Sequence, residues 1–288
     1  MKGIFSILLL TALVSGCSTT SAGRGFDLIY EGEYRKAIPF LDQSIQQYGD
    51  KTAAVALGYL YMGNSQMEPD VDKVRYYHQL TQQMPDGADD QWLRYYYPVM
   101  ESWLMLSDDD RGNDVQAVKI LRASRYSEYP RALIMLGKAY AYGRGTGENL
   151  TIARALMDRA VEYDRYLGAA HAHAWLLVTH PDERFRDVGL AYQLMQKVMA
   201  DSDMSGLSSV HDTWAAVLAN SGNFPAAVDA ENRALTLLQQ QPLAEEQKAI
   251  IASWYQCRLQ AYRGEQVMRF RYDENPFDAG LSERCRDS

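Results

Sequence analysis

Apolar residues recur between residues 26 and 264 with the period of an amphipathic α-helix. Stretches of about 12 to 18 residues with this period alternate with short segments rich in Gly, Asp, Asn or Pro. The chain has no Asn-Gly hairpin dipeptide and few runs in which polar residues alternate with β-branched ones. The pattern therefore predicts an all-α chain of helices joined by short turns.

One pair of predicted helices is especially clear. Its first apolar stripe consists of Leu133, Leu136, Gly137 and Tyr140, and its second of Ala153, Leu156, Met157 and Ala160. Between the stripes lies the glycine-rich segment 143–147. Small residues on both stripes allow two helix axes to approach closely, and the short turn makes the helices antiparallel.

Residues 132–160 closely resemble the Sel-like variant of the tetratricopeptide repeat. The matching positions are Ala132, Leu136, Gly137, Tyr140, Gly143, Gly145, Asn149, Ala153 and Ala160, and Thr146 departs from the valine that is usual there. A weaker copy begins at Ala53, residues 211–235 resemble an ordinary tetratricopeptide unit, and residues 32–41 resemble the second helix of a unit.

The clear copies begin near residues 53, 132 and 210. This spacing of roughly 79 residues corresponds to two repeats of about 34–40 residues, so we expect degenerate units at 89–126 and 168–200. A single hairpin cannot bury its own apolar face, and stacking of repeats supplies the core. The expected fold is an all-α superhelix, a solenoid of about six helix pairs over residues 26–264, with a C-terminal tail at 265–288.

The N-terminus has the pattern of a secretory signal. Lys2 precedes an apolar run of about eleven residues, which as a helix reaches only about 16 Å and is too short to span a bilayer. The following residues, Val-Ser-Gly-Cys17, resemble the bacterial lipobox. The resemblance implies that residues 1–16 are cleaved, that Cys17 is acylated, and that 17–25 form a flexible tether. Ser18 resembles the signal for the periplasmic face of the outer membrane. The alternative is an ordinary secretory signal.

The composition of the chain excludes some classes of binding partner. The chain has 288 residues with 37 acidic against 29 basic side chains, and its formal net charge is −8. This excess of acid argues against a nucleic-acid binder and against electrostatic adhesion to anionic lipid. Besides Cys17, the cysteines are Cys257 and Cys285, which we expect to form a disulfide in an oxidising periplasm and to attach the tail to the last helix. The alternative is a buried thiol and a free one.

The sequence offers no catalytic, cofactor or metal motif. It lacks a Gly-x-Ser-x-Gly elbow, and the glycines at 143–147 lack the strand and the lysine of a phosphate loop. His171 and His173 would point about 200° apart on a helix, so they cannot share a metal ion. The acidic stretch 108–114 is interpreted as a solvated turn. We therefore expect a protein that is not an enzyme, with a hydrolase using paired carboxylates as a remote alternative.

The resemblance also implies which residues form a binding surface. In tetratricopeptide-like units the first helix of each pair lines the concave face, which here selects Tyr59, Arg131, Lys138, Tyr142, Asp212 and Asn220. The expected function is a protein-interaction scaffold for an envelope assembly such as secretion, pilus or exopolysaccharide machinery. The alternative is a lipoprotein that binds peptidoglycan or exopolysaccharide. That alternative predicts exposed aromatic platforms among Trp92, Trp103, Trp175, Trp214 and Trp254.

Overall fold

The computed structural model describes residues 21–85, 91–107, 111–123, 126 and 128–270. These residues contain thirteen α-helices and no strand longer than an isolated bridge, which confirms the all-α prediction. The α-helices are α1 (Ser21–Tyr30), α2 (Tyr34–Tyr48), α3 (Lys51–Leu60), α4 (Val71–Gln83), α5 (Tyr97–Ser107), α6 (Asp114–Leu121), α7 (Pro130–Tyr142), α8 (Leu150–Tyr163), α9 (Gly168–Thr179), α10 (Val188–Ala200), α11 (Ser208–Asn220), α12 (Phe224–Gln240) and α13 (Glu245–Arg263). A π-helical turn, η1 (Trp92–Tyr96), leads into α5.

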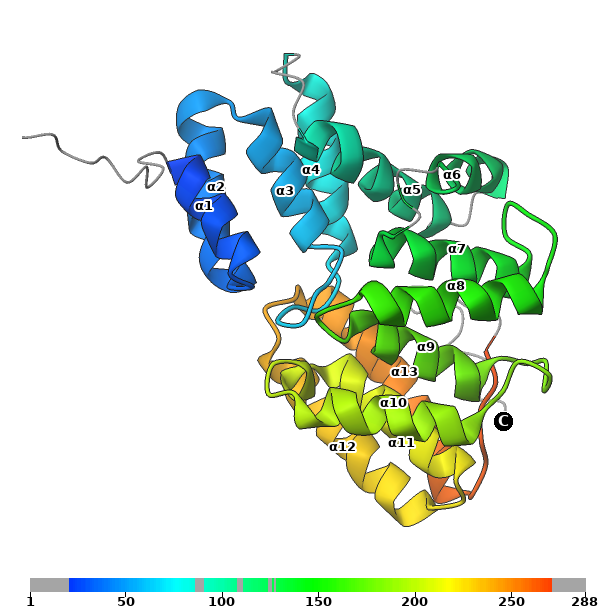
Figure 1. Ribbon diagram of the computed structural model, residues 1–288. Coiled ribbons are helices and arrows are strands. Elements are labelled where there is room, and N and C mark those ends of the chain that lie inside the picture. Colours follow the sequence, from blue (N-terminus) through cyan, green and yellow to red (C-terminus); the bar gives the residue numbers. More distant parts are fainter. Residues whose placement is uncertain (1–20, 86–90, 108–110, 124–125, 127, 271–288) are drawn as a thin grey trace, which may run out of the picture.

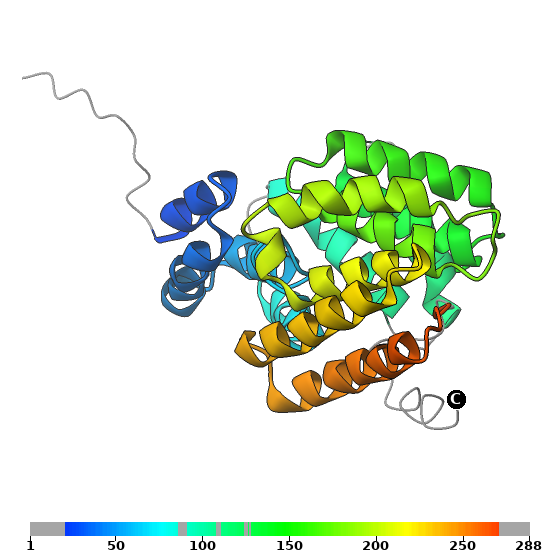
Figure 2. The ribbon, with the colours of Figure 1, turned by 90° about the horizontal axis from the view of Figure 1, so that it is seen from below.

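The first twelve α-helices form six consecutive pairs, and α13 follows the last pair. The two degenerate units predicted at 89–126 and 168–200 correspond to α5 with α6 and to α9 with α10. Figure 2 shows the helices of the C-terminal half lying side by side, from α8 in green to α13 in orange. Each helix thus packs on its chain neighbours, as expected when apolar stripes are buried by stacking.

The pair α7–α8 has the predicted geometry. Helix α7 ends at Gly143, whose positive φ of 70° suits glycine, and the side chain of Asn149 caps the start of α8 by accepting a hydrogen bond from the Ile152 amide at 3.0 Å. A Cβ atom at Gly137 would lie 2.7 Å from the Met157 sulfur. A larger residue here would displace the Met157 side chain, so glycine favours the close approach of the two helices.

The prediction that Asp114 lies in a solvated turn is wrong. Its side chain is buried and accepts two hydrogen bonds from the Arg144 guanidinium, at 2.6 and 2.7 Å. A Cβ atom at Gly145 would lie 2.2 Å from the Asp114 carbonyl oxygen, so the glycine turn packs directly on the start of α6. The acidic composition of this segment predicted that Asp114 is exposed to solvent. Instead, Asp114 is buried, and its ion pair with Arg144 joins two successive repeats.

The predicted tether at 17–25 is too long. Helix α1 begins at Ser21, and Gly25 is buried where a Cβ atom would lie 2.8 Å from Leu41. Residues 21–25 therefore belong to the folded part. Cys17 and the signal segment 1–16 lie outside the described residues. No helix in the described ranges is long and apolar enough to cross a membrane.

The array of helices curves, so that α11 and α13 lie across a central space from α3 and α4 (Figure 1). The connection between α3 and α4 runs into this space. There, the Gln247 amide of α13 donates a hydrogen bond to Asp72 at 2.8 Å. Early and late repeats are therefore in direct contact, and they enclose a cavity on the concave side.

Candidate binding chamber

A chamber of about 1020 Å³ occupies the concave side of the array. Its lining residues come from both halves of the chain and include residues of α7, α9 and α11. Of the six residues predicted on the concave face, the five that line the chamber are Tyr59, Arg131, Lys138, Tyr142 and Asp212. Asn220 lies outside it, and its side chain donates a hydrogen bond to the Ala216 carbonyl oxygen one turn back on α11.

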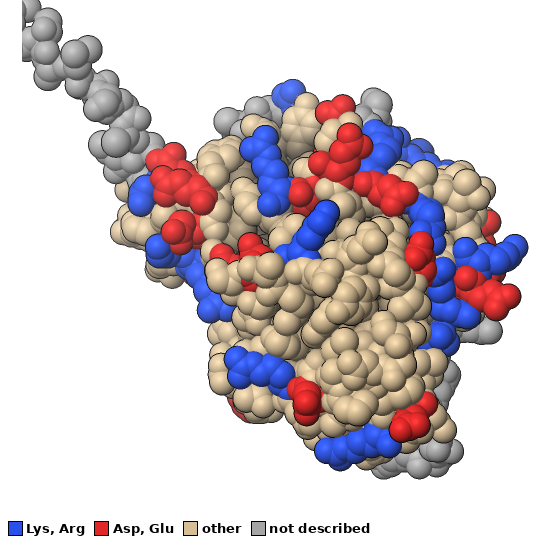
Figure 3. Space-filling model, turned by 60° about the horizontal axis from the view of Figure 1, so that its bottom comes forward, with Lys and Arg blue, Asp and Glu red and all other residues tan. Residues whose placement is uncertain are grey.

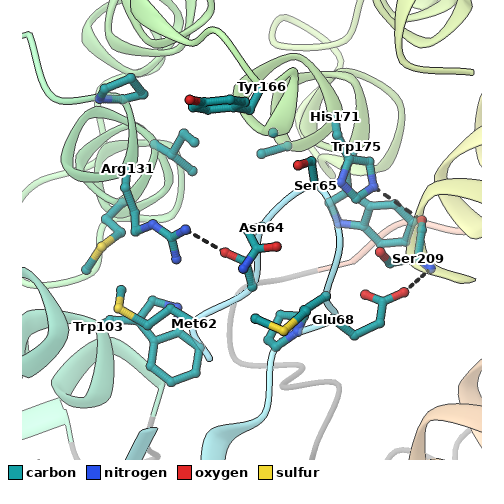
Figure 4. Close-up of a pocket in the computed structure, with 18 of the residues that line it drawn as sticks. Met62, Asn64, Ser65, Glu68, Trp103, Arg131, Tyr166, His171, Trp175 and Ser209 are labelled. Carbon is teal, nitrogen blue, oxygen red and sulfur yellow. Dashed lines mark hydrogen bonds between the residues drawn. The ribbon is translucent and has the colours of Figure 1, made fainter. Parts of the chain in front are cut away.

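Residues 62–69, which we call the inserted segment, run through this chamber (Figure 4). The Arg131 guanidinium donates a hydrogen bond to the Gly63 carbonyl oxygen. At the far end of the segment, the Glu68 carboxylate accepts hydrogen bonds from the Ser208 hydroxyl at 2.9 Å and the Ser209 amide at 2.8 Å. These donors lie at the start of α11, where the helix dipole favours a negative charge. Within the segment, Asn64 and Met67 exchange backbone hydrogen bonds at 3.0 and 3.4 Å, which closes a tight turn. The chamber thus already holds a turn of its own chain.

Aromatic rings form the wall next to α3, which we call the tyrosine wall (Tyr59, Trp92, Tyr96 and Tyr129). Tyr59 contacts Tyr96 edge-on with 4.9 Å between ring centroids, and Tyr96 stacks on Trp92 at 4.1 Å. The Arg131 guanidinium lies 4.5 Å from the centroid of the Tyr59 ring. Burial raises the pKa of the Tyr129 hydroxyl well above its ordinary value. The wall therefore presents neutral phenols and one cation.

Three more tyrosines surround the opening of the chamber, and we call them the mouth tyrosines (Tyr30, Tyr163 and Tyr166). Their exposed fractions are 65%, 38% and 44%. Tyr166 also meets Tyr34 edge-on at 5.7 Å. Large exposed aromatic side chains grouped at one opening are uncommon on a surface without a binding role.

The loop that carries Tyr166 has an unusual backbone. Leu167 adopts a left-handed conformation with φ of 62°, which is rare for a side chain of this size. The Asp164 carboxylate holds the loop by accepting hydrogen bonds from the Tyr166 amide at 2.9 Å and the Ala169 amide at 2.6 Å. Strained backbone that surrounding contacts enforce is concentrated at functional sites. Here it places Tyr166 over the opening.

The charge of the chamber is opposite to that of the chain. Its lining contains six basic and three acidic residues, whereas the whole chain has more acid than base. All three acids are already engaged: Glu68 and Asp164 as described above, and Asp212 with Arg258. On the outer face seen in Figure 3, basic and acidic side chains are interspersed. With Arg144 paired to Asp114 and Arg258 paired to Asp212, the rest of the lining still has more basic than acidic residues.

Lys138 is the clearest free cation in the lining. It lies on α7, two turns from Arg131, and makes no ion pair or hydrogen bond to any residue that the structure describes. Burial lowers the pKa of its ammonium group, and no nearby carboxylate opposes this effect. His171 lies across the same space, bonded through Nε2 to Thr213 at 2.8 Å, and burial lowers its pKa to about 4. The imidazole is therefore neutral at pH 7 and adds no charge.

The opposite end of the chamber contains a closed ionic group, the Arg258 cluster (Asp212, Glu231 and Arg258). Arg258 on α13 contacts Asp212 on α11 at 2.5 Å and Glu231 on α12 at 3.6 Å. Burial, followed by the charge of Asp212, raises the pKa of Glu231 well above its ordinary value. Four aromatic rings lie within 6 Å of the guanidinium, those of Trp175, Trp254, Tyr255 and Phe270. Asp212 is therefore a buried structural ion here, not the exposed contact expected from the repeat pattern.

The tryptophans do not form exposed platforms. Trp92 and Trp254 are buried, and Trp103, Trp175 and Trp214 are half-buried. Four of them line the chamber, with Trp214 outside it. The exposed aromatic residues at the opening are tyrosines. No sequence feature distinguished them from the tyrosines that pack between repeats.

The predictions for the two histidines and for the two cysteines have different outcomes. His171 and His173 point apart as expected, since His171 faces the chamber and His173 is 1% exposed beside Asp158. Within the described ranges, no group of three or more His, Cys, Asp or Glu side chains could hold a metal ion. Cys257 is buried and disulfide-bonded. Cys285 lies outside the described residues, so the pairing of these two cysteines stays a prediction.

Comparison of the chain with protein families, with curated proteins and with solved structures gives no match.

Proposed function

We propose that this protein is a lipid-anchored interaction scaffold of the bacterial envelope, which binds a partner polypeptide in its concave chamber. The N-terminal resemblance to a lipobox supports the anchor at Cys17, on the periplasmic face of the outer membrane. One observation supports polypeptide as the ligand: the inserted segment, a tight turn of the chain itself, already lies in the chamber. It is held there through the Gly63 carbonyl group by Arg131 and through the Glu68 carboxylate by the start of α11.

The absence of enzymatic activity is part of the proposal. A hydrolase using paired carboxylates needs one acid that reaches the substrate and a second that assists it. Next to the chamber, Asp212 and Glu231 form a buried pair of acids, and Glu231 is 0% exposed. Arg258 contacts both acids, which favours a structural role.

The binding site is tested by crosslinking in intact envelopes. A photoreactive phenylalanine replaces Tyr166 at the mouth, and a second variant carries it at Tyr48, which is 72% exposed and outside the chamber. We expect the Tyr166 variant to crosslink one polypeptide that the Tyr48 variant does not, with the attachment point mapped by mass spectrometry. Crosslinks that are identical from both positions would contradict the proposal.

The anchor is tested separately. Cys17→Ala removes the acylated side chain, and several acyl chains make membrane attachment practically permanent. We expect the wild-type protein in the membrane pellet and the Cys17→Ala variant in the periplasmic fraction. A variant that stays in the pellet after a high-salt wash would show that the lipobox interpretation is wrong.

A glycan is the second candidate ligand, and the mouth tyrosines favour it because flat rings with polar tips stack on sugars. Peptidoglycan fragments and acidic oligosaccharides are suitable probes. Saturable binding that Tyr166→Ala abolishes, together with no polypeptide crosslink, would favour this candidate over the first.

A further inference from the structure

The lining of the chamber specifies the chemistry of its ligand more closely than the proposed function does. Lys138 and Arg131 lie on the same helix, α7, and both face the chamber. Their sequence separation of seven residues places their Cα atoms about 10.5 Å apart along the helix axis. The two cations thus form a short row across the floor of the chamber, between the tyrosine wall and His171.

The row lacks a counterion within the described chain. The three acids of the lining are occupied by backbone amides or by Arg258, as described above. Arg131 contacts only a neutral carbonyl group and the Tyr59 ring, and Lys138 contacts no acid. Lys138 is half-buried, and an ammonium group that has lost part of its water without gaining a carboxylate destabilises the folded state. Retaining it in a chamber open to solvent is understandable if a ligand supplies the negative charge.

The inserted segment shows how a carboxylate of a polypeptide is held in this chamber. The segment forms a tight turn beside the row, and its own carboxylate, Glu68, is bound at the start of α11 on the far side. In an extended chain, residues two to four positions apart are about 7–14 Å apart. Two carboxylates at that separation could therefore reach Arg131 and Lys138 together.

From these observations we propose that the row formed by Arg131 and Lys138 binds an extended acidic segment of the partner polypeptide, with two Asp or Glu side chains two to four residues apart. This inference rests on the proposed function, because it names the chemistry of the partner. The aromatic rings next to the row, Tyr59 and Tyr166, contact the uncharged residues between the acids. His171 stays neutral at pH 7 and does not contribute to the charge.

The test uses the full-length protein in detergent and a fluorescein-labelled octapeptide, Gly-Ser-Glu-Ala-Ser-Glu-Gly-Ser. The comparison peptide replaces both glutamates with glutamine, and an oligogalacturonate of similar charge represents an acidic glycan. We expect the acidic peptide to bind at least tenfold more tightly than the glutamine peptide at low salt, and the difference to shrink at high salt. Equal binding of the two peptides would overturn the inference.

Variants then locate the site. Lys138→Met and Arg131→Gln should each weaken binding of the acidic peptide about five- to tenfold, whereas Lys197→Met should leave it unchanged. Lys197 is the matched control because it is exposed on α10 and outside the chamber. Unchanged binding by both chamber variants would overturn the inference.

A second readout separates binding from folding. Removing a partly desolvated charge that has no counterion relieves its cost, so Lys138→Met should unfold at the same or a higher urea concentration than the wild type while it binds more weakly. A variant that loses stability and binding together would indicate a structural lysine and would overturn the assignment of Lys138.

The remaining outcomes separate this inference from the proposed function. If the Tyr166 crosslinker captures a partner at a segment without Asp or Glu, the inference fails and the proposed function stands. If oligogalacturonate binds more tightly than the acidic peptide and Lys138→Met abolishes this, the ligand is an acidic glycan and both polypeptide proposals fail.

Discussion

The two ends of the chamber use the same residue types in opposite ways. At one end, Arg258 is in contact with two carboxyl groups and four rings, and every charge has a counterpart within the fold. At the other end, Arg131 and Lys138 face the chamber beside a wall of tyrosines without an acid. The contrast indicates that a buried cation with its counterions stabilises the fold, whereas a cation without them is free to bind a ligand.

The largest expected effect comes from breaking the balanced end. Arg258→Met leaves Asp212 and Glu231 buried without their cation, which should lower the free energy of unfolding by about 3–5 kcal/mol. Urea denaturation followed by circular dichroism measures it. The matched control is Glu231→Gln, which should cost less than about 1 kcal/mol because burial and the charge of Asp212 raise the pKa of this carboxyl group and so disfavour its charged form. Equal losses in the two variants would show that both carboxyl groups are charged.

A pH-dependent effect comes next, and it compares a buried histidine with the one facing the chamber. Burial lowers the pKa of His173 from 6.5 to about 4, so between these values the unfolded chain binds a proton that the folded chain does not. Stability is therefore full above pH 6.5 and falls as the pH drops toward 4, by about 3 kcal/mol for this group.

His173→Gln should remove that dependence, as measured by urea denaturation at pH 7 and pH 4.5. His171→Gln should change the dependence less, because His171 is half-buried and water in the chamber can solvate its charge. A larger change from His171 than from His173 would contradict the assigned exposure of the two rings.

A smaller effect on stability is expected where the inserted segment connects the two ends of the chamber. Glu68→Gln replaces a charged acceptor of two hydrogen bonds at the start of α11, which should lower the free energy of unfolding by about 1–3 kcal/mol. Asp203→Asn serves as the control, because its hydrogen bond to Gln66 lies at the exposed surface. If the two substitutions cost the same in urea, the Glu68 contact does not hold the segment in the chamber.

The smallest effect concerns the mouth. Tyr166→Ala should change the free energy of unfolding by less than about 0.5–1 kcal/mol, since much of the ring is exposed and its one ring contact is with Tyr34. Thermal unfolding with circular dichroism checks this. A large loss would make Tyr166 a packing residue and would remove the mouth tyrosines from the binding surface.

Much of the architecture could be predicted from the pattern of apolar residues. The stripe that includes Leu133 and Gly137 predicted both the helix α7 and its close approach to α8, because small residues at helical spacing have few other uses. The repeat spacing predicted six helix pairs, including the two degenerate ones. The predictions for Asp114 and for residues 21–25 were wrong because composition reports average exposure, whereas burial depends on which repeat lies opposite.

The site was only half predictable. The resemblance to tetratricopeptide-like units predicted Arg131, Lys138 and Tyr59 as concave residues, and all three line the chamber. The sequence did not distinguish Asp212, which pairs with a residue 46 positions away, from an exposed acid. Nor did it indicate that the loop after α3 enters the chamber, because Glu68 bonds to residues about 140 positions later in the chain.

The sequence by itself thus determined the helices and their pairing, because these follow from local spacing and from the period of the repeat. Its resemblance to tetratricopeptide-like units predicted five residues that line the chamber. The tertiary structure alone decided which inward-facing charges are neutralised. That outcome depends on the curvature of the array, which brings α11 and α13 up to the inserted segment and gives Asp212 and Glu68 their partners. The same curvature leaves Lys138 without a counterion among the described residues. Contacts between distant repeats, which no local pattern encodes, separate the stabilising charges from the free ones.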